Sequence, residues 1–246
     1  MSAVLRLTAI ETRLFFREPI SLIFAVVIPP VLLIVLGLVP GFREPDADLG
    51  GLRVIDIYTP LVVAMTITTL ALTSLPLLLA TYREKGVLRR MRTTPIRPTA
   101  MIVAQLLMST MIALAVMLIV LAIARLGFDV SLPQNLLSYL AAFLLAALAM
   151  FAVGLLVASL APGGASASAI GLVLFFPMLF FAGLWIPRSS MNDVLLTISD
   201  LTPLGAAVQS LQDAALGDWP QLLHVAVMLG WAIVAGGLAA RFFRWE

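Results

Sequence analysis

Long apolar blocks separated by short polar connections run along the whole chain. A helix needs roughly 20 residues, at 1.5 Å each, to cross a bilayer core of about 30 Å. Six blocks are long enough, namely 20–39, 57–80, 100–124, 136–160, 168–186 and 221–240. No segment has the alternating apolar and polar residues of a membrane β-strand. The sequence therefore predicts an all-α integral membrane protein with six transmembrane helices, in a single domain over residues 1–246.

The composition excludes an ordinary soluble domain. Hydrophobic residues make up 62% of the chain and charged residues 11%, whereas soluble domains average roughly 45–50% and about 25%. Cysteine is absent and His224 is the single histidine, so we expect no thiol chemistry and no metal site. An intramembrane enzyme needs converging His, Asp or Glu residues within its spans. None are present, so no catalytic residue is predicted.

The basic residues predict the orientation of the spans. Short basic loops resist translocation and stay in the cytoplasm. With both termini inside, 11 of the 15 Lys and Arg residues are internal: Arg6, Arg13, Arg17, Arg83, Lys85, Arg89, Arg90, Arg92, Arg97, Arg241 and Arg244. We therefore expect a multi-pass protein of the plasma membrane with both termini cytoplasmic.

Residues 2–18, which precede the first span, predict a helix lying along the membrane surface. At 100° per residue, Arg6, Arg13 and Arg17 fall on one narrow stripe, with apolar residues such as Leu14 beside it.

The external loop 187–220 is too apolar for a free loop, with Leu195, Leu196 and Ile198 close together. Exposed irregular backbone is not tolerated in lipid. We therefore expect short half-inserted helices before the last span.

The loop 81–99, which contains YREKGVLRRMRTTPIRP, is the most informative segment. As a helix over 83–92 it places Val87, Leu88 and Met91 on one face and basic residues around them. An apolar face with a basic rim suits docking into a groove of a partner protein. The alternative is that the basic residues only fix the topology and contact anionic headgroups.

This loop resembles the cytoplasmic loop of type-2 ABC export permeases, in which an R-E-x-G-x-L-x-R-x-R-x-T-P-like run follows the second span. The matching residues are Arg83, Glu84, Gly86, Leu88, Arg90, Arg92, Thr94 and Pro95. The R-E-P sequence before span one and the segment 201–204, Leu-Thr-Pro-Leu, are also similar to elements of the family. The chain departs from the family at Thr202, where Asn is usual, and at Gln212, where an Arg often follows.

The resemblance implies that a separate ATP-binding-cassette ATPase subunit contacts the N-terminal helix and this loop. The implied coupling residues are Arg83, Glu84, Val87, Leu88, Arg90 and Met91. The chain contains no G-x-x-x-x-G-K-[ST] phosphate loop, so we expect ATP and Mg on the partner and no cofactor on this chain. The resemblance also implies export. Six spans can hardly enclose a substrate path alone, so we expect a dimer with an identical or closely related second permease. The apolar lining with its threonines and phenylalanines suggests a hydrophobic or amphipathic cargo such as a drug, antibiotic or lipid.

Spans two and five contain the candidates for a substrate path. These candidates are Thr59, Thr66, Thr69, Thr73, Phe176 and Phe180. The threonines fall within one stripe of span two, and the resemblance implies that spans two and five line the cavity of the dimer. The alternative is packing alone, because a threonine in a membrane helix can bond its own backbone.

The centres of the spans lack ionisable residues. Ion-coupled carriers usually need one, so this pattern favours an external source of energy. Sodium sites built from hydroxyls and backbone carbonyls keep an ion-coupled secondary carrier open as an alternative. A non-transporting membrane scaffold is the other alternative.

Overall fold

The computed structural model describes residues 3–49, 51–87, 90 and 99–243. This part of the chain is helical, with no extended structure beyond one isolated bridge between Pro45 and Arg53. Six of its helical segments are long and apolar enough to cross a membrane. The predicted all-α fold with six spans is confirmed.

The spans follow one another along the chain. They are Pro19–Leu38 (α2, η1 and α3), Val54–Glu84 (α4, η4 and α5), Thr99–Phe128 (α7), Leu136–Leu160 (α8), Gly164–Phe181 (α9) and Leu222–Phe242 (α12). The first two spans are divided into α2 (Pro19–Leu22), η1 (Ile23–Val27), α3 (Ile28–Leu38), α4 (Val54–Thr69), η4 (Leu70–Ser74) and α5 (Leu75–Glu84). The helices outside the spans are α1 (Ala3–Phe15), α10 (Asp193–Leu201) and α11 (Pro203–Leu216), with short 3₁₀ turns at Pro40–Phe42, Ala47–Leu49 and Arg188–Ser190.

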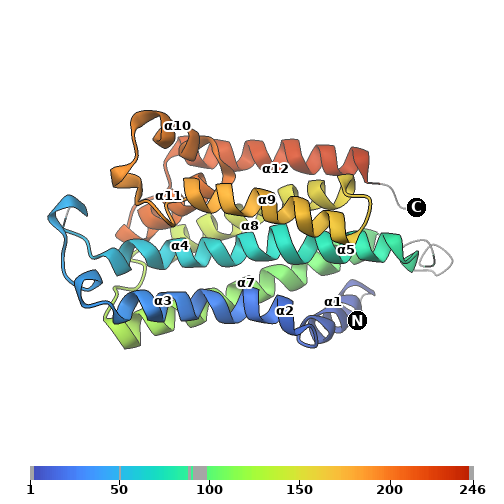
Figure 1. The fold of residues 1–246 in the computed structure, drawn as a ribbon, viewed down its shortest axis with the longest axis horizontal. Coiled ribbons are helices and arrows are strands. Elements are labelled where there is room, and N and C mark those ends of the chain that lie inside the picture. The colour runs from blue at the N-terminus through green and yellow to red at the C-terminus, as the bar shows by residue number, and fades with distance from the viewer. Residues whose placement is uncertain (1–2, 50, 88–89, 91–98, 244–246) are drawn as a thin grey trace.

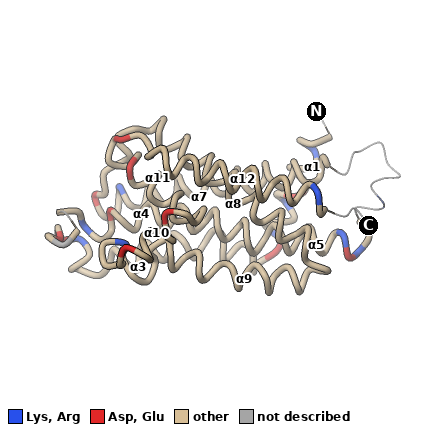
Figure 2. The backbone as a smooth tube through the Cα atoms, turned by 90° about the horizontal axis from the view of Figure 1, so that it is seen from above, with Lys and Arg blue, Asp and Glu red and all other residues tan. Residues whose placement is uncertain are grey.

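The bundle has two distinct ends (Figure 1). The end that holds α1, the end of α5 and the end of α12 (Leu222–Phe242) is called the termini end. The end that holds residues 39–53 and α10 is called the loop end. Charged residues gather toward these two ends, and the bundle between them is almost free of them (Figure 2).

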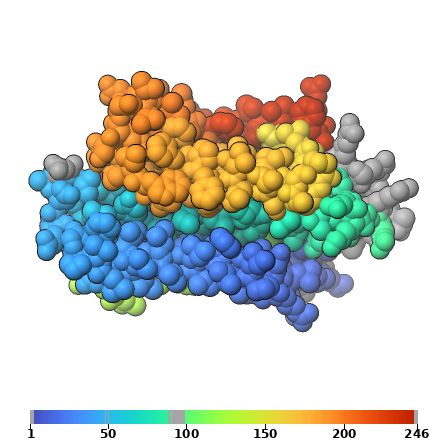
Figure 3. Space-filling view, viewed as in Figure 1, coloured from blue at the N-terminus to red at the C-terminus, as the bar shows by residue number. Residues whose placement is uncertain are grey.

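Span two forms the centre of the bundle. In its most apolar window 83% of the residues are buried, against 22% in α9 and in α12. The space-filling view shows α4 and α5 only as a strip between the first span and α9 (Figure 3). Any displacement of span two is therefore felt by several neighbouring helices.

Two of the spans contain a wide π-helical turn, and each turn comes just before a proline. The turn η1 precedes Pro29, and η4 precedes Pro76. Proline removes one backbone donor and crowds the preceding turn. A single wide turn accommodates this disturbance without breaking the helix.

Two glycines make room for η4. A Cβ atom on Gly154 of α8 would overlap the carbonyl oxygen of Ala71, and one on Gly171 of α9 would overlap that of Leu72. The absence of side chains lets both helices touch the backbone of span two. Close contact of this kind is how membrane helices gain packing energy.

The expected short helices before the last span are present as α10 and α11, which meet at an angle of 92°. Thr202 stands at the bend, and its hydroxyl accepts a hydrogen bond from the amide of Gly205 at 3.1 Å. Pro203 follows at the first helical position, which proline favours. The departure from Asn to Thr therefore keeps an N-cap, because both side chains can accept this bond.

A cluster of polar side chains holds α10 against α12. The carboxylate of Asp200 pairs with Arg188 and lies 3.2 Å from Nε2 of His224. His224 is 3% exposed. The single histidine is thus part of a contact that fixes the bent helix pair.

Candidate functional site

Arg83, at the termini end of span two, binds the last turn of α8. Its guanidinium donates to the carbonyl oxygens of Ala158 at 3.1 Å, of Ser159 at 3.5 Å and of Ala161. The last four carbonyls of a helix lack partners within the helix. A cation at this place satisfies them and complements the negative end of the helix dipole.

Glu84, the next residue, binds the first turn of α9. Its Oε2 accepts a hydrogen bond from the amide of Gly164 at 3.0 Å. The carboxylate complements the positive end of that helix dipole. A Cβ on Gly163 would lie 2.7 Å from the same oxygen, so this glycine lets the carboxylate approach. Arg83 and Glu84 together hold both sides of the turn between α8 and α9, and we call this contact the Arg83–Glu84 clamp.

The helix expected over 83–92 is interrupted. α5 ends at Glu84, and Gly86 has a φ of +67°, a conformation that glycine adopts without strain. Beyond it Val87 is half-buried and Arg90 is exposed. The other two predicted coupling residues, Leu88 and Met91, lie outside the described residues.

A buried carboxylate joins α1 to two spans. Glu11 of α1 is 3% exposed. It accepts hydrogen bonds from the hydroxyl of Tyr82 at 3.0 Å and from Nε2 of Gln105 at 2.5 Å. Burial raises the pKa of the Glu11 carboxyl. The predicted basic residues of this region, Arg6 and Arg13, are exposed, as is Arg17 just after the helix.

Sequence reasoning missed Glu11, although its spacing offered a signal. Thr8, Glu11 and Phe15 are the buried residues of α1, and they recur at the three- and four-residue steps of one helix face. An acid on that face, away from the arginine stripe, indicates a buried partner. The partners themselves lie 71 and 94 residues away along the chain, which no local pattern reveals.

The raised pKa of Glu11 predicts how stability depends on pH. The folded carboxyl binds its proton more tightly than the unfolded one, so the free energy of unfolding falls as pH rises through this pKa. Glu11→Gln should remove part of that fall, because the amide oxygen still accepts from Tyr82. Thermal unfolding in detergent between pH 5 and 8 measures the effect. The exposed Glu18→Gln is the control, and identical pH profiles for the two variants would contradict the prediction.

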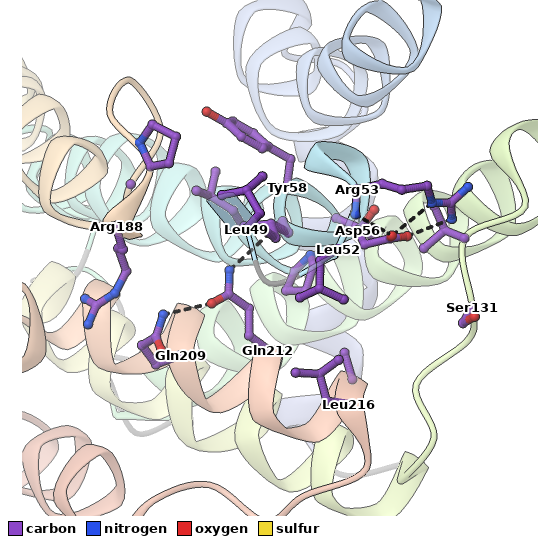
Figure 4. Close-up of a pocket in the computed structure, with 18 of the residues that line it drawn as sticks. Leu49, Leu52, Arg53, Asp56, Tyr58, Ser131, Arg188, Gln209, Gln212 and Leu216 are labelled. Carbon is purple, nitrogen blue, oxygen red and sulfur yellow. Dashed lines mark hydrogen bonds and ion pairs between the residues drawn. The ribbon is translucent and has the colours of Figure 1, made fainter. Parts of the chain in front are cut away.

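A cavity of about 760 Å³ opens at the loop end, between residues 45–53, the start of α4, the start of α8 and α11. Figure 4 shows its labelled lining. The amide of Gln212 donates to the carbonyl oxygen of Ile57 at 3.2 Å, and Gln209 donates to Gln212 at 2.8 Å. Gln212 thus donates to a backbone carbonyl of span two near Pro60. Drug-sized ligands occupy cavities of roughly 300–1,000 Å³.

An ion pair forms one wall of this cavity. Arg53 donates to both carboxylate oxygens of Asp56, at 2.9 and 2.8 Å. The same guanidinium donates to the carbonyl oxygens of Phe128 and Asp129. Asp56 raises the pKa of Arg53, so this guanidinium stays charged. The pair caps the first turn of α4 and links that turn to the end of α7.

The family of the chain follows from a sequence comparison. A model of the ABC-2 type transporter family matches residues 2–216. The chain belongs to the ABC-2 type transporter family. A comparison with curated proteins found no match. The clamp and the cavity therefore lie at opposite ends of the membrane domain of an ABC transporter.

Three of the four threonines in the stripe of this ABC-2 permease are buried, and Thr73 is half-buried. Thr59, Thr66 and Thr69 are at most 2% exposed. Their hydroxyls donate to the carbonyls four residues earlier, at 2.7, 3.2 and 2.9 Å, and Thr73 does the same at 2.6 Å. Within one copy these contacts fit the packing alternative for three of the four residues. Thr59 differs, because it also lines the cavity at the loop end.

The predicted aromatic residues lie elsewhere, on α9. Phe176 is 51% exposed and lies near Trp185, with ring centroids 6.2 Å apart. Phe180 is half-buried and packs edge-on against Phe181. The structure therefore does not bring the threonines and phenylalanines together into one site within a single copy.

Proposed function

We propose that this chain is the permease subunit of an ATP-driven exporter. A separate ATP-binding-cassette subunit carries ATP and Mg, and a second permease, identical or closely related, completes the assembly. The cargo is a hydrophobic or amphipathic molecule such as a drug, antibiotic or lipid. The Arg83–Glu84 clamp is the observation that best supports this function, because it joins the loop after span two to spans four and five.

The clamp supplies a route for force. An ATPase docked on loop 81–99 would push at the end of span two. Arg83 holds the end of α8 and Glu84 holds the start of α9, so one displacement would move both helices. The buried Glu11 would carry the same displacement to α1. Closure at the termini end would thus reach three spans and the surface helix together.

The orientation follows the basic residues. The termini end faces the cytoplasm of a plasma-membrane protein in this proposal, because α1, the loop 81–99 and the C-terminal segment hold most Lys and Arg residues. The cargo path would run between two copies, along the exposed side of Phe176. The buried threonines of span two would face it only after the helices rearrange.

Association with the ATPase tests the docking surface. Leu88→Asp combined with Met91→Asp should reduce co-purification of the ATP-binding subunit at least tenfold, because two carboxylates would replace the apolar face. A matched double variant at the loop end, Leu132→Asp with Val194→Asp, alters exposed apolar residues far from the loop. Undiminished association of the first variant would rule out this docking surface.

Transport itself tests the source of energy. Inverted vesicles with the permease and its ATPase should move the uncharged dye N-phenylnaphthylamine only when ATP is supplied. Vesicles with the permease alone should not move it under a proton or sodium gradient. Gradient-driven movement without the ATPase would instead support the ion-coupled carrier.

A further inference from the structure

The charged and the uncharged polar groups that line the cavity at the loop end differ in whether they already have partners. Every charged side chain among the described residues that line it is already paired: Arg53 with Asp56, and Arg188 with Asp200. A charged ligand would have to compete with these pairs. A charge brought into such a site without a partner is unfavourable.

Several uncharged polar groups of the lining, in contrast, lack a partner. The hydroxyl of Tyr139 is buried and has no hydrogen-bond partner in the part of the chain that is described. The side chains of Ser131, Ser189 and Gln134 also line the cavity and make no hydrogen bond with the described residues. A buried hydroxyl without a partner costs free energy. A ligand that bonds to it regains this energy.

The remaining wall is apolar. Leucines from four different parts of the chain face the same space, namely Leu49, Leu52, Leu121, Leu196 and Leu216. Some of them, with the Gln209–Gln212 pair, appear together in Figure 4. Burial of a short alkyl chain against them is favourable, and the gain grows with each CH₂ group.

We propose that this cavity binds an uncharged amphiphile whose head carries hydroxyl or carbonyl groups. The head bonds to Tyr139, Ser131 and Gln134, and the apolar tail lies on the leucines. Such a molecule could come from two sources, the exported cargo or a lipid of the surrounding leaflet. Binding needs only this chain, so the inference stands apart from the proposed ATP-driven export.

Three probes with the same chain length test the charge preference. They are 1-octanoylglycerol, octanoate and octyltrimethylammonium. Ser189→Cys, at the exposed rim of the lining and not among the groups that bind the head, is labelled with an environment-sensitive dye and reports occupancy in nanodiscs, because the chain has no other cysteine. Leu126→Cys, 87% exposed at the same end and outside the lining, reports partition into the lipid. We expect octanoylglycerol to bind at least tenfold more tightly than either ion, and equal or tighter binding of an ion would overturn the proposal.

Two variants test the site itself. Tyr139→Phe removes only the hydroxyl and should weaken octanoylglycerol binding about tenfold without lowering the unfolding temperature. Leu216→Trp should obstruct the cavity from a half-exposed position and abolish the signal, whereas Leu126→Trp should not. Unchanged binding in both Tyr139→Phe and Leu216→Trp would show that the probe binds elsewhere, and would overturn the proposal.

Native mass spectrometry and transport distinguish the two sources. A leaflet lipid should remain bound to the purified chain and be lost in Leu216→Trp, with ATP-driven dye movement unchanged. A cargo site should instead show dye movement that octanoylglycerol inhibits and that Leu216→Trp abolishes. If octanoylglycerol does not bind in the titration, the proposed binding site is wrong. If ATP does not drive movement of the dye, only the proposed function is wrong.

Discussion

We expect Gly171→Ala to lower the amount of folded permease several-fold. A methyl group at this position would overlap the carbonyl oxygen of Leu72, which belongs to the backbone of η4. A backbone atom inside a π-helical turn cannot rotate away as a flexible side chain can. α9 would have to separate from span two, which is buried at the centre of the bundle.

The expected size of the effect follows from measured overpacking. Inserting methylene groups into packed cores typically costs about 1–3 kcal/mol. The added methyl group would meet a backbone atom, so we expect a cost at the upper end of this range. The free energy of unfolding should fall by about 3 kcal/mol from roughly 5–15 kcal/mol. The yield of monodisperse protein in detergent and its unfolding temperature measure this loss. Gly154→Ala should behave in the same way, because its methyl group would overlap the carbonyl oxygen of Ala71.

Two glycines of α12 provide matched controls. A Cβ on Gly236 would lie 3.8 Å from the Cβ of Ala152, an ordinary contact, and one on Gly230 would meet nothing within 4 Å. Alanine is the better helix former by about 1 kcal/mol. Gly236→Ala and Gly230→Ala should therefore leave the yield unchanged or raise it. Equal yields for Gly171→Ala and these controls would contradict the packing around η4.

These glycines also show where sequence reasoning stops. Gly154 and Gly236 both have an alanine four residues later and fit the same small-residue spacing. The structure gives a backbone contact to the first and an ordinary contact to the second. Spacing identifies a face on which helices can approach closely, but it does not say which helix approaches.

The spans were predictable because hydrophobic length is a local property. Six apolar blocks became six spans, with ends shifted by up to five residues. The largest extensions, of four residues each, are at the end of α7, at the start of α9 and at the end of the second span, which continues to Glu84 until Gly86 ends it. The bend at Thr202 was harder to predict from the sequence, because the helices on either side of it are short.

The site was only partly predictable, because its contacts join distant parts of the chain. Arg83 and Glu84 stood out by resemblance, but their contacts on α8 and α9 lie 75 to 80 residues away in sequence. The cavity at the loop end likewise joins six separate stretches of the chain, between residues 45 and 216. Among the predicted path residues, only Thr59 belongs to it.

Breaking the Arg83–Glu84 clamp should uncouple ATP hydrolysis from movement of the spans. Arg83→Ala leaves the last carbonyls of α8 without a donor, and hydrogen bonds to a charged group contribute about 1.5–3 kcal/mol each. Glu84→Gln can still accept from Gly164 but loses the charge that complements the α9 dipole. We therefore expect a large loss of coupling for Arg83→Ala and a smaller one for Glu84→Gln.

The readout of this loss does not require the cargo. Spin labels on the exposed Ala169→Cys of two copies report the distance between α9 helices by pulsed electron paramagnetic resonance. ATP should change that distance in the parent complex, and Arg83→Ala should reduce the change at least tenfold while the ATPase still co-purifies. Lys85→Ala removes an exposed neighbouring charge that has no hydrogen bond or ion pair with the described residues, and it should behave like the parent. A full distance change in a folded Arg83→Ala complex would mean that the force reaches α9 by another route.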